Sequence, residues 1–289
     1  MRNTDKILIT GCDGFIGKEL SKYLYHQGYR IYGLGRRKKS ENQYLSEYYS
    51  FDIGDPFYIQ ERFRTVIHLA TLNVNNIEVR TTSFEEYFRV NVIGTKNLID
   101  GCYAEKLIYL STANIYDREE NEIDEHSNIN PRNDYEKTKY LGERVCQEHW
   151  KGDLLILRPV NISGPFQRTD AIIPVFFRNA MHGKTIQIFV PSNKELQILS
   201  SKDFCEFIVL AIKEKINGIY NLASSDQITI TKLAEKILRI CSSNSNIIVS
   251  NNKLERHSQV ICQKAYKDTS WCAKESIDSI LKEYYQNYE

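Results

Sequence analysis

The chain has 289 residues, of which 42% are hydrophobic, 11% aromatic and 26% charged, and its formal net charge at pH 7 is +1. This apolar and aromatic content argues against a disordered chain, and the near-neutral charge argues against a nucleic-acid binder, which would show a strong basic excess. No apolar run approaches the roughly 18–20 residues that a membrane span needs, and the N-terminal residues lack the apolar stretch and small-residue cleavage site of a signal peptide.

Short β-branched runs alternate with helical patterns through the first two thirds of the chain. In chain order, strands are expected at 6–10, 30–34, 65–70, 106–111 and 153–158, and helices at 15–27, 83–102 and 134–150. In the first helix Ile16, Leu20 and Leu24 recur at four-residue spacing, and Gly28 follows as a stop signal. Strands that alternate with helices predict parallel strands joined by crossover helices. The predicted fold class is therefore α/β, with a Rossmann-like doubly wound parallel sheet.

The pattern changes after Gly164. Further helices are expected at 172–181, 203–214, 231–241 and 275–286, and further strands near 185–190 and at 218–222. We therefore expect a sheet domain over residues 1–164, with returning segments near 195–225. A smaller C-terminal α/β lobe, with substrate binding as its main role, is expected over 165–289.

The seven cysteines are scattered along the chain. None forms a CxxC pair and none has the Cys/His spacing of a zinc site, so we expect no metal centre. An odd, evenly spread set is typical of reduced thiols that pack as small apolar side chains. Together with the absence of a signal-peptide pattern, this predicts a cytoplasmic protein.

A glycine-rich turn joins the first predicted strand to the first predicted helix. Gly11, Gly14 and Gly17 follow the spacing GxxGxxG. Glycine permits a tight turn and lets backbone N–H groups approach a pyrophosphate, and the helix N-terminus adds positive potential there. The position predicts a dinucleotide-binding site that includes Phe15 and Ile16 at the start of the helix.

The end of the second predicted strand indicates which dinucleotide binds. An NAD site usually places an acidic side chain there to hold the ribose 2′-hydroxyl. In this chain Gly35 is followed instead by Arg36 and Arg37. A guanidinium pairs with a 2′-phosphate in a forked geometry, whereas a carboxylate would repel it. The sequence therefore favours NADP(H) over NAD(H), and an ordinary solvated basic loop is the alternative.

Two more segments that follow predicted strands are expected to meet the cofactor. Asp52 and Ile53 come after the third strand, where they would reach the adenine edge. Leu69 and Ala70 end the fourth strand and would lie under the cofactor. His68, beside them, is expected to be a core histidine near the cofactor rather than a catalyst.

Tyr135 and Lys139 are four residues apart on a predicted helix, which places both on one face. A tyrosine hydroxyl with a pKa of about 10 is a poor acid–base catalyst at neutral pH, and a nearby ammonium favours the phenolate and lowers that pKa. Of the nineteen tyrosines, only Tyr135 has a lysine at this offset. Upstream, Ser111 and Thr112 end a predicted strand, where a hydroxyl could bind the substrate oxygen. A solvated helical pair is the alternative for a motif that stands alone.

Together these motifs resemble the extended short-chain dehydrogenase/reductase family, and within it the nucleotide-sugar branch. The matching stretches are TGCDGFIG at 10–17 (family TGxxGFIG), NVIGTKNL at 91–98 (NVxGTxNL), LSTANIY at 110–116 (SSxxVY), YEKTK at 135–139 (YxxxK), LRPVNISGP at 157–165 (LRxxNVYGP) and IYNLAS at 219–224 (YNIGS). The resemblance covers nearly the whole chain, in the family's order and spacing.

The resemblance implies a Rossmann-like sheet, a substrate lobe and chemistry at a sugar carbon. It aligns Thr112 with the family's catalytic Ser/Thr, beside Tyr135 and Lys139. It also places Asn91 among the cofactor-binding residues and Asn161 in the substrate pocket, with a buried structural amide as the alternative for Asn161. Relatives commonly dimerise through the two helices that correspond to 83–102 and 134–150, so a homodimer is implied.

Departures from the family pattern narrow the expected reaction. The family's 4,6-dehydratases follow the Ser/Thr with an Asp–Glu pair that performs elimination, but this chain has Ala113 and Asn114 there. Asn114 also occupies the place of the cysteine found in epimerase-reductases. Sugar 4-epimerases of the family usually hold NAD and keep the acidic residue that is missing after the second strand. What remains is a ketoreductase, in which NADPH gives hydride to a keto-sugar carbon and Tyr135 gives the proton.

One departure concerns the substrate. The family's RDF segment, whose arginine grips the sugar-nucleotide diphosphate, reads Leu196-Gln197-Ile198 here. Arg168 is the candidate replacement, and a solvated loop arginine or a substrate without a nucleotide are the alternatives. The predicted function is NADPH-dependent 4-ketoreduction of a nucleotide-linked deoxysugar for polysaccharide precursor synthesis. A 4-epimerase with a retained cofactor and a non-catalytic NADP-binding sensor are the other hypotheses.

Overall fold

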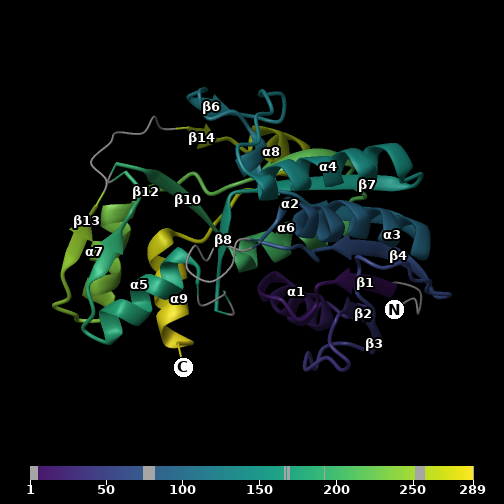
Figure 1. Ribbon diagram of the computed structural model, residues 1–289, viewed down its shortest axis with the longest axis horizontal. Coiled ribbons are helices and arrows are strands. Elements are labelled where there is room, and N and C mark those ends of the chain that lie inside the picture. The colour runs from purple at the N-terminus through teal and green to yellow at the C-terminus, as the bar shows by residue number, and fades with distance from the viewer. Residues whose placement is uncertain are drawn as a thin grey trace. The chain divides into compact units, whose positions relative to one another are not determined.

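The computed structural model describes residues 6–73, 82–165, 167, 170–191, 193–250 and 258–288 (Figure 1). The chain divides into two compact units. The first unit comprises 1–116, 129–159 and 205–220, and the second comprises 117–128, 160–204 and 221–289. Segment 205–220 belongs to the first unit and segment 117–128 to the second.

Seven strands form the central sheet, in the order β11-β7-β5-β4-β1-β2-β3. Their bounds are β1 Lys6–Thr10, β2 Arg30–Gly35, β3 Glu47–Ser50, β4 Arg62–His68, β5 Tyr103–Leu110, β7 Asp153–Pro159 and β11 Gly218–Leu222. The registered pairs from β3 across to β7 are all parallel. The strand order runs outward from β1 in both directions, which confirms the predicted doubly wound, Rossmann-like sheet. The carboxyl edge beside β1 is the switch point at which such sheets bind ligands.

The helices of the first unit follow the expected positions with one exception. They are α1 Phe15–His26, α2 Phe84–Phe88, α3 Gly94–Gly101 and α4 Asp134–His149. The single helix expected at 83–102 contains a π-helical turn, Arg89–Ile93, between α2 and α3. Sequence periodicity does not distinguish such a turn from a regular helix, because it inserts only one residue into the helical pattern.

One face of the central sheet packs against α3 and α4. The apolar cluster there includes Leu8, Tyr32, Val66, Leu107, Tyr109 and Ile156 from the strands, with Leu98 from α3 and Cys146 from α4. Burying one such aliphatic or aromatic side chain contributes roughly 1.5–3 kcal/mol. Because strand residues alternate between faces, Ile7 and Ile9 on β1 point to the opposite side of the sheet, where they are also fully buried.

The second unit is built from short strands and four helices within the described residues. The strands are β6 Glu122–Ile123, β8 Asn161–Ser163, β9 Ile186–Ile188, β10 Glu195–Ser200, β12 Gln227–Thr229, β13 Ile247–Val249 and β14 Gln259–Val260. The helices are α5 Ile172–Met181, α7 Ile230–Ile240, α8 Gln263–Thr269 and α9 Ile277–Gln286; α6 Ser201–Lys213 runs from the second unit into the first. The strands pair as β12-β10-β8, β13-β9 and β14-β6.

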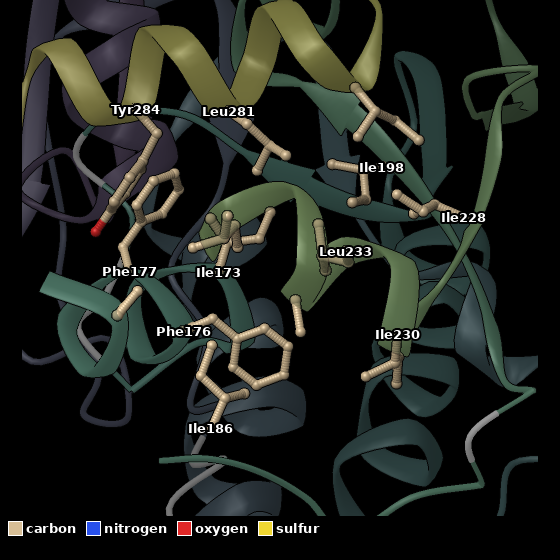
Figure 2. Packing of buried hydrophobic residues seen from close by; sticks show 14 of the residues in the cluster. Ile173, Phe176, Phe177, Ile186, Ile198, Ile228, Ile230, Leu233, Leu281 and Tyr284 are labelled. Atoms are coloured by element: carbon tan, nitrogen blue, oxygen red, sulfur yellow. The ribbon is translucent and has the colours of Figure 1, made fainter. Parts of the chain in front are cut away.

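Three helices of the second unit share one apolar core. Figure 2 shows Phe177 of α5, Leu233 of α7 and Leu281 of α9 converging on it, and all three are fully buried. The ring of Phe177 stacks on that of Tyr284, with centroids 5.0 Å apart. The second unit therefore has its own hydrophobic core. Within the described parts of the chain, no helix is both long and apolar enough to cross a membrane.

Candidate functional site

The turn between β1 and α1 has the geometry of a phosphate cradle. Gly11 has φ +69°, and a Cβ there would come 2.9 Å from the backbone nitrogen of Ala70 at the end of β4. A Cβ on Gly17 would overlap the carbonyl oxygen of Gly11. Gly14, the residue before α1, makes no side-chain cap. The first N–H groups of α1 therefore keep their capacity to bind an anion.

The loop after β2 is hydrogen-bonded to this turn and carries the two predicted arginines. Asn42 Nδ2 donates to the Cys12 carbonyl at 2.9 Å. Arg36 and Arg37 are both exposed. The Arg37 carbonyl accepts hydrogen bonds from Tyr48 Oη at 2.9 Å and from Ser50 Oγ at 2.8 Å, and its side chain pairs with Glu41. The backbone at the end of β2 is thus fixed, while the Arg36 side chain extends at the surface.

Asp13 in the glycine turn is a candidate that the sequence analysis missed. Ser40 Oγ donates to one of its carboxylate oxygens. The other oxygen is buried, accepts no hydrogen bond from any described residue, and lies 3.6 Å from where a Cβ on Gly35 would be. The sequence shows only that one variable position of TGxxGFIG is acidic. Its proximity to Gly35 depends on the folded loop.

Asp52 and Ile53 both form contacts within the protein. Burial works against ionisation of Asp52, but the N–H of Gly54 and the guanidinium of Arg89, at 3.1 Å, together hold its pKa below the usual value. Ile53 is buried in the apolar cluster under α3, and its carbonyl accepts a hydrogen bond from Asn97 Nδ2. Their contact with an adenine stays a prediction.

His68 sits in a buried chain of hydrogen bonds at the carboxyl edge of the sheet. Thr95 Oγ1 donates to the Asn91 carbonyl at 2.7 Å, so His68 Nε2, 3.0 Å away, donates to Thr95. Thr10 Oγ1 accepts from the Ala70 N–H and donates to His68 Nδ1 at 2.8 Å. This pattern needs a neutral imidazole. Burial, with the nearby Lys139 ammonium, lowers the pKa of His68 to about 3, which fits the expected core histidine.

The side chain of Asn91 joins three segments of the first unit. Its oxygen accepts hydrogen bonds from Leu72 N at 2.8 Å and from Thr71 Oγ1 at 3.0 Å. Its nitrogen donates to Thr138 Oγ1 on α4 at 3.0 Å. Asn91 lies in the π-helical turn and is 1% exposed. It therefore fixes the segment after β4 and the first turns of α4, and its contact with a cofactor stays a prediction.

Tyr135 and Lys139 lie on the first two turns of α4, which begins after the N-cap Asn133. Tyr135 is half-buried and Lys139 is 3% exposed. Burial, with smaller contributions from the Glu136 carboxylate and Tyr87, raises the pKa of Tyr135 above its ordinary value. This is opposite to the lowering expected from a nearby ammonium, because burial disfavours the charged phenolate. Tyr135 therefore carries its proton at neutral pH, the form that a proton donor requires.

Thr112 ends the segment after β5 and is buried. Its hydroxyl oxygen accepts the Asn114 N–H at 3.2 Å and so caps the 3-10 turn Ala113–Ile115, which contacts α4. The hydroxyl hydrogen of Thr112 remains able to donate. Ser111, also buried, has a hydroxyl oxygen without a hydrogen-bond partner among the described residues. The two hydroxyls, the glycine turn and Ala70 all follow the carboxyl ends of neighbouring parallel strands.

A buried ion pair holds α4 against the sheet. Arg158 on β7 donates to both carboxylate oxygens of Glu143 on α4, at 3.0 and 2.6 Å. It also donates to Tyr116 Oη at 2.8 Å. All three side chains are at most 5% exposed. A forked pair of this kind fixes both position and rotation of the helix that carries the Tyr–Lys pair.

Of the predicted substrate residues, Thr112 belongs to the first unit and Asn161 to the second. Asn161 is exposed rather than a buried amide, and its nitrogen lies 3.4 Å from the Gln197 carbonyl. Gln197, in the segment that corresponds to the family's RDF, is buried and bonds the backbone of Ser224 and Val260 at 2.8–2.9 Å. It therefore joins strands rather than presenting a group to a ligand. Arg168 lies outside the described residues.

No group of three or more His, Cys, Asp or Glu side chains that could hold a metal occurs among the residues that the structure describes. All seven cysteines are free thiols. Burial raises the pKa values of Cys12, Cys102, Cys146 and Cys262 to about 12, which leaves these thiols protonated at neutral pH. The site therefore depends on hydroxyls, an ammonium and backbone N–H groups.

Comparison with known proteins identifies the family. The model of the NAD dependent epimerase/dehydratase family matches residues 7–223. A dTDP-D-glucose 4,6-dehydratase of Mus musculus is 25% identical, over 95% of this chain and 83% of that protein. Its counterpart in Dictyostelium discoideum is 28% identical over 81% of this chain, which spans 62% of that protein. A UDP-N-acetyl-alpha-D-glucosaminuronate decarboxylase of Bacillus cytotoxicus is 26% identical, over 84% of this chain and 82% of that protein.

Solved structures agree on the fold. A UDP-glucose 4-epimerase of Thermotoga maritima, crystallised with UDP-glucose, aligns with a TM-score of 0.84 at 22% identity, over 97% of this chain and 98% of that one. A UDP-glucuronic acid 4-epimerase of Bacillus cereus, in complex with UDP-glucuronic acid and NAD, aligns with a TM-score of 0.83 at 21% identity, over 98% of both chains. With the family model matched over most of its length, this chain belongs to the NAD-dependent epimerase/dehydratase family.

Proposed function

We propose that this protein is an NADPH-dependent reductase of a keto group on a nucleotide-linked deoxysugar, supplying a polysaccharide precursor. The observation that carries the proposal is the placement of Tyr135 on α4, one helical turn from the buried Lys139, where burial raises the pKa of the phenol. The 3-10 turn capped by Thr112 contacts the same helix. A protonated phenol is suited to deliver a proton to a carbonyl oxygen while hydride reaches the carbon.

The residues of the first unit fit a nicotinamide dinucleotide. Gly11 and Gly17 approach neighbouring backbone so closely that neither position admits a Cβ, as the tight turn of a pyrophosphate-binding loop requires. The N–H groups at the start of α1 would bind its oxygens, and Lys139 would hold the nicotinamide ribose. The dinucleotide supplies the hydride. Thr112 and Tyr135 would hold the substrate oxygen, and Tyr135 Oη would release its proton to that oxygen.

The NADP(H) form is proposed from the two arginines after β2. Arg36 is exposed and close enough to Asp52 to act on its carboxylate. A guanidinium that follows β2 can pair with the 2′-phosphate on the ribose of NADP(H). The carboxylate of Asp13 next to Gly35 opposes this choice, because it would repel the same phosphate. Cofactor selectivity is therefore a competition between Arg36 and Asp13.

Reduction is preferred over dehydration, although several relatives by sequence are dehydratases. The two positions after Thr112 hold Ala113 and Asn114, and neither side chain can exchange a proton with a sugar carbon. A 4-epimerase is the second candidate. It is favoured by Asp13, which places an acid near the end of β2 where the sequence shows none.

The experiment is a screen of keto-sugar nucleotides with NADPH, read as loss of reduced-cofactor absorbance. Consumption of NADPH in proportion to product supports the reductase. Turnover of a sugar nucleotide by the purified protein without added reductant would instead establish the epimerase. Tight NADPH binding without turnover of any keto-sugar nucleotide or sugar nucleotide would contradict both and leave a sensor.

A further inference from the structure

The ammonium of Lys139 is buried without a carboxylate partner. Lys139 is 3% exposed, and it makes no ion pair within the described part of the chain. Glu143 lies one turn further along α4, but both its oxygens are taken by Arg158 at 3.0 and 2.6 Å. A buried charge without a partner is costly, so some other group must stabilise this ammonium.

An aromatic ring, instead of a carboxylate, lies against the Lys139 ammonium. Lys139 Nζ lies 4.3 Å from the centroid of the Tyr109 ring. Tyr109, on β5, is 1% exposed, and its hydroxyl donates to the Lys139 carbonyl at 3.2 Å. The ring of His68, its partner on β4, meets it edge to face with centroids 5.5 Å apart. Ring and ammonium are thus held together by the sheet, by α4 and by a hydrogen bond.

The helix is shaped to receive this ring. A Cβ on Gly142, three residues after Lys139 on α4, would overlap the Tyr109 hydroxyl. Glycine in a helix interior is less favourable than alanine. The absence of a side chain at 142 gives Tyr109 the space in which its ring lies under the ammonium.

The other titratable groups near Lys139 do not form an ion pair with it in the described part of the chain. His68 on β4 is neutral, with a pKa of about 3. Burial raises the pKa values of Cys146 and Tyr135 on α4, so both keep their protons. The Glu143 carboxylate favours the charged form of Lys139, but its ion pair is with Arg158 on β7. Burial lowers the pKa of Lys139 to about 8, so its charge at neutral pH is retained by a small margin.

We propose that Tyr109 is a positioning residue whose ring face holds the Lys139 ammonium charged and in place. The electron-rich face of an aromatic ring attracts a cation, and the attraction is strongest where both are desolvated. In the proposed reaction this keeps Lys139 charged and oriented for the cofactor ribose, and this consequence rests on the proposed function. The contact between the Tyr109 ring and the Lys139 ammonium is independent of the proposed function.

The test is an NMR titration of the Lys139 amine in protein labelled with ¹⁵N and ¹³C at lysine, with Lys139→Arg to assign the signal. Tyr109→Phe keeps the ring and loses the hydroxyl, so its Lys139 pKa should stay within a few tenths of the wild-type value. Tyr109→Leu removes the ring. The Lys139 ammonium then lacks the aromatic face that stabilises it, so the pKa of Lys139 should fall by about one unit. At a fixed pH this lowers the ratio of ammonium to neutral amine tenfold.

A ring series keeps the test decisive if Tyr109→Leu fails to fold. Phenylalanine, difluorophenylalanine and pentafluorophenylalanine at position 109 have similar size, but fluorine progressively weakens the attraction of the ring face for a cation. The Lys139 pKa should fall stepwise along the series, and NADPH affinity measured by calorimetry at pH 8 should fall with it. A Lys139 pKa that does not change across the fluorinated rings would overturn the proposal. If the pKa falls but no keto-sugar is reduced, the proposed function fails and the role of Tyr109 stands.

Discussion

At the scale of single residues, a basic and an acidic side chain lie beside the end of β2. Arg36 extends at the surface after β2, while a buried oxygen of Asp13 lies 3.6 Å from the Cβ position of Gly35. The guanidinium favours a phosphorylated ribose and the carboxylate favours a free hydroxyl. Under the proposed function, the two side chains would make separable contributions to cofactor choice.

Substitution of Arg36 and Asp13 should move cofactor preference in opposite directions. Arg36→Ala should weaken NADPH binding roughly ten- to a hundredfold, the effect of a lost charged hydrogen bond, and leave NADH almost unchanged. Asp13→Asn should strengthen NADPH binding relative to NADH, because the repulsion is removed. Calorimetry with both cofactors measures this, with Lys39→Ala in the same loop as the control. Equal loss of NADPH affinity in Lys39→Ala and Arg36→Ala would assign the effect to general surface charge.

His68 should make the protein sensitive to acid. Its pKa in the folded chain is about 3, against 6.5 for the unperturbed side chain, so the unfolded state binds the proton more readily. The stability that this group contributes is present above pH 6.5 and is lost as the pH falls toward 3. Between pH 6.5 and pH 4 the loss should be about 3 kcal/mol. Urea unfolding across this range measures it, and NMR should show a neutral His68 ring at pH 5. Protonation of that ring near pH 6.5 in the folded protein would refute the prediction.

At the scale of elements, α4 is the component that the site depends on. It carries Tyr135 and Lys139 on its early turns and Glu143 one turn later, where Arg158 fixes it against β7. The π-helical turn adds a second fixed point through the hydrogen bond between Asn91 and Thr138. The position of Tyr135 on α4 is therefore determined from two sides.

Breaking the buried Glu143–Arg158 ion pair should lower the free energy of unfolding far more than breaking an ion pair at the surface. Glu143→Gln leaves the Arg158 guanidinium buried without a counter-charge, and unfolding free energy should fall by about 3–5 kcal/mol. Lys236→Gln, which removes the pair with Asp278 at the surface, should cost at most about 1 kcal/mol. Urea denaturation of both variants makes the comparison. A similar small loss in both would mean that the Arg158 pair does not anchor α4.

Local patterns predicted the glycine turn and the Tyr–Lys pair because each motif is recognised from the spacing of residues only a few positions apart. The glycine turn and the parallel sheet are present as predicted. Strands of two or three residues such as β6 and β14 were not predicted, because a period of two cannot be recognised over that length. The roles of Asp13 and Gln197 were missed for another reason. Each depends on contacts with residues at least 22 positions away, as from Asp13 to Gly35.

At the scale of the whole molecule, the helices beside the site expose apolar side chains. Phe84 of α2 is 39% exposed, Ile93 of the π-helical turn 41% and Leu141 of α4 36%. We propose that these helices form a homodimer interface, since apolar side chains exposed close together mark contact surfaces.

The dimer proposal predicts a change of mass on a single substitution. Leu141→Glu should convert the protein to a monomer in light scattering, because a charge would be buried at the interface. Tyr25→Glu, on α1 at a position 54% exposed, should leave the mass unchanged. A wild-type protein that is monomeric at micromolar concentration would contradict the proposal.

The central claim, that Tyr135 is the proton donor of a hydride transfer, is tested most directly by single-turnover reduction of the keto-sugar nucleotide identified in the screen. Tyr135→Phe should slow NADPH oxidation about 10²- to 10⁴-fold while NADPH affinity stays near the wild-type value. Tyr140→Phe, on the same helix, should react at the wild-type rate. A rate for Tyr135→Phe within a factor of three of the wild-type rate would contradict the account.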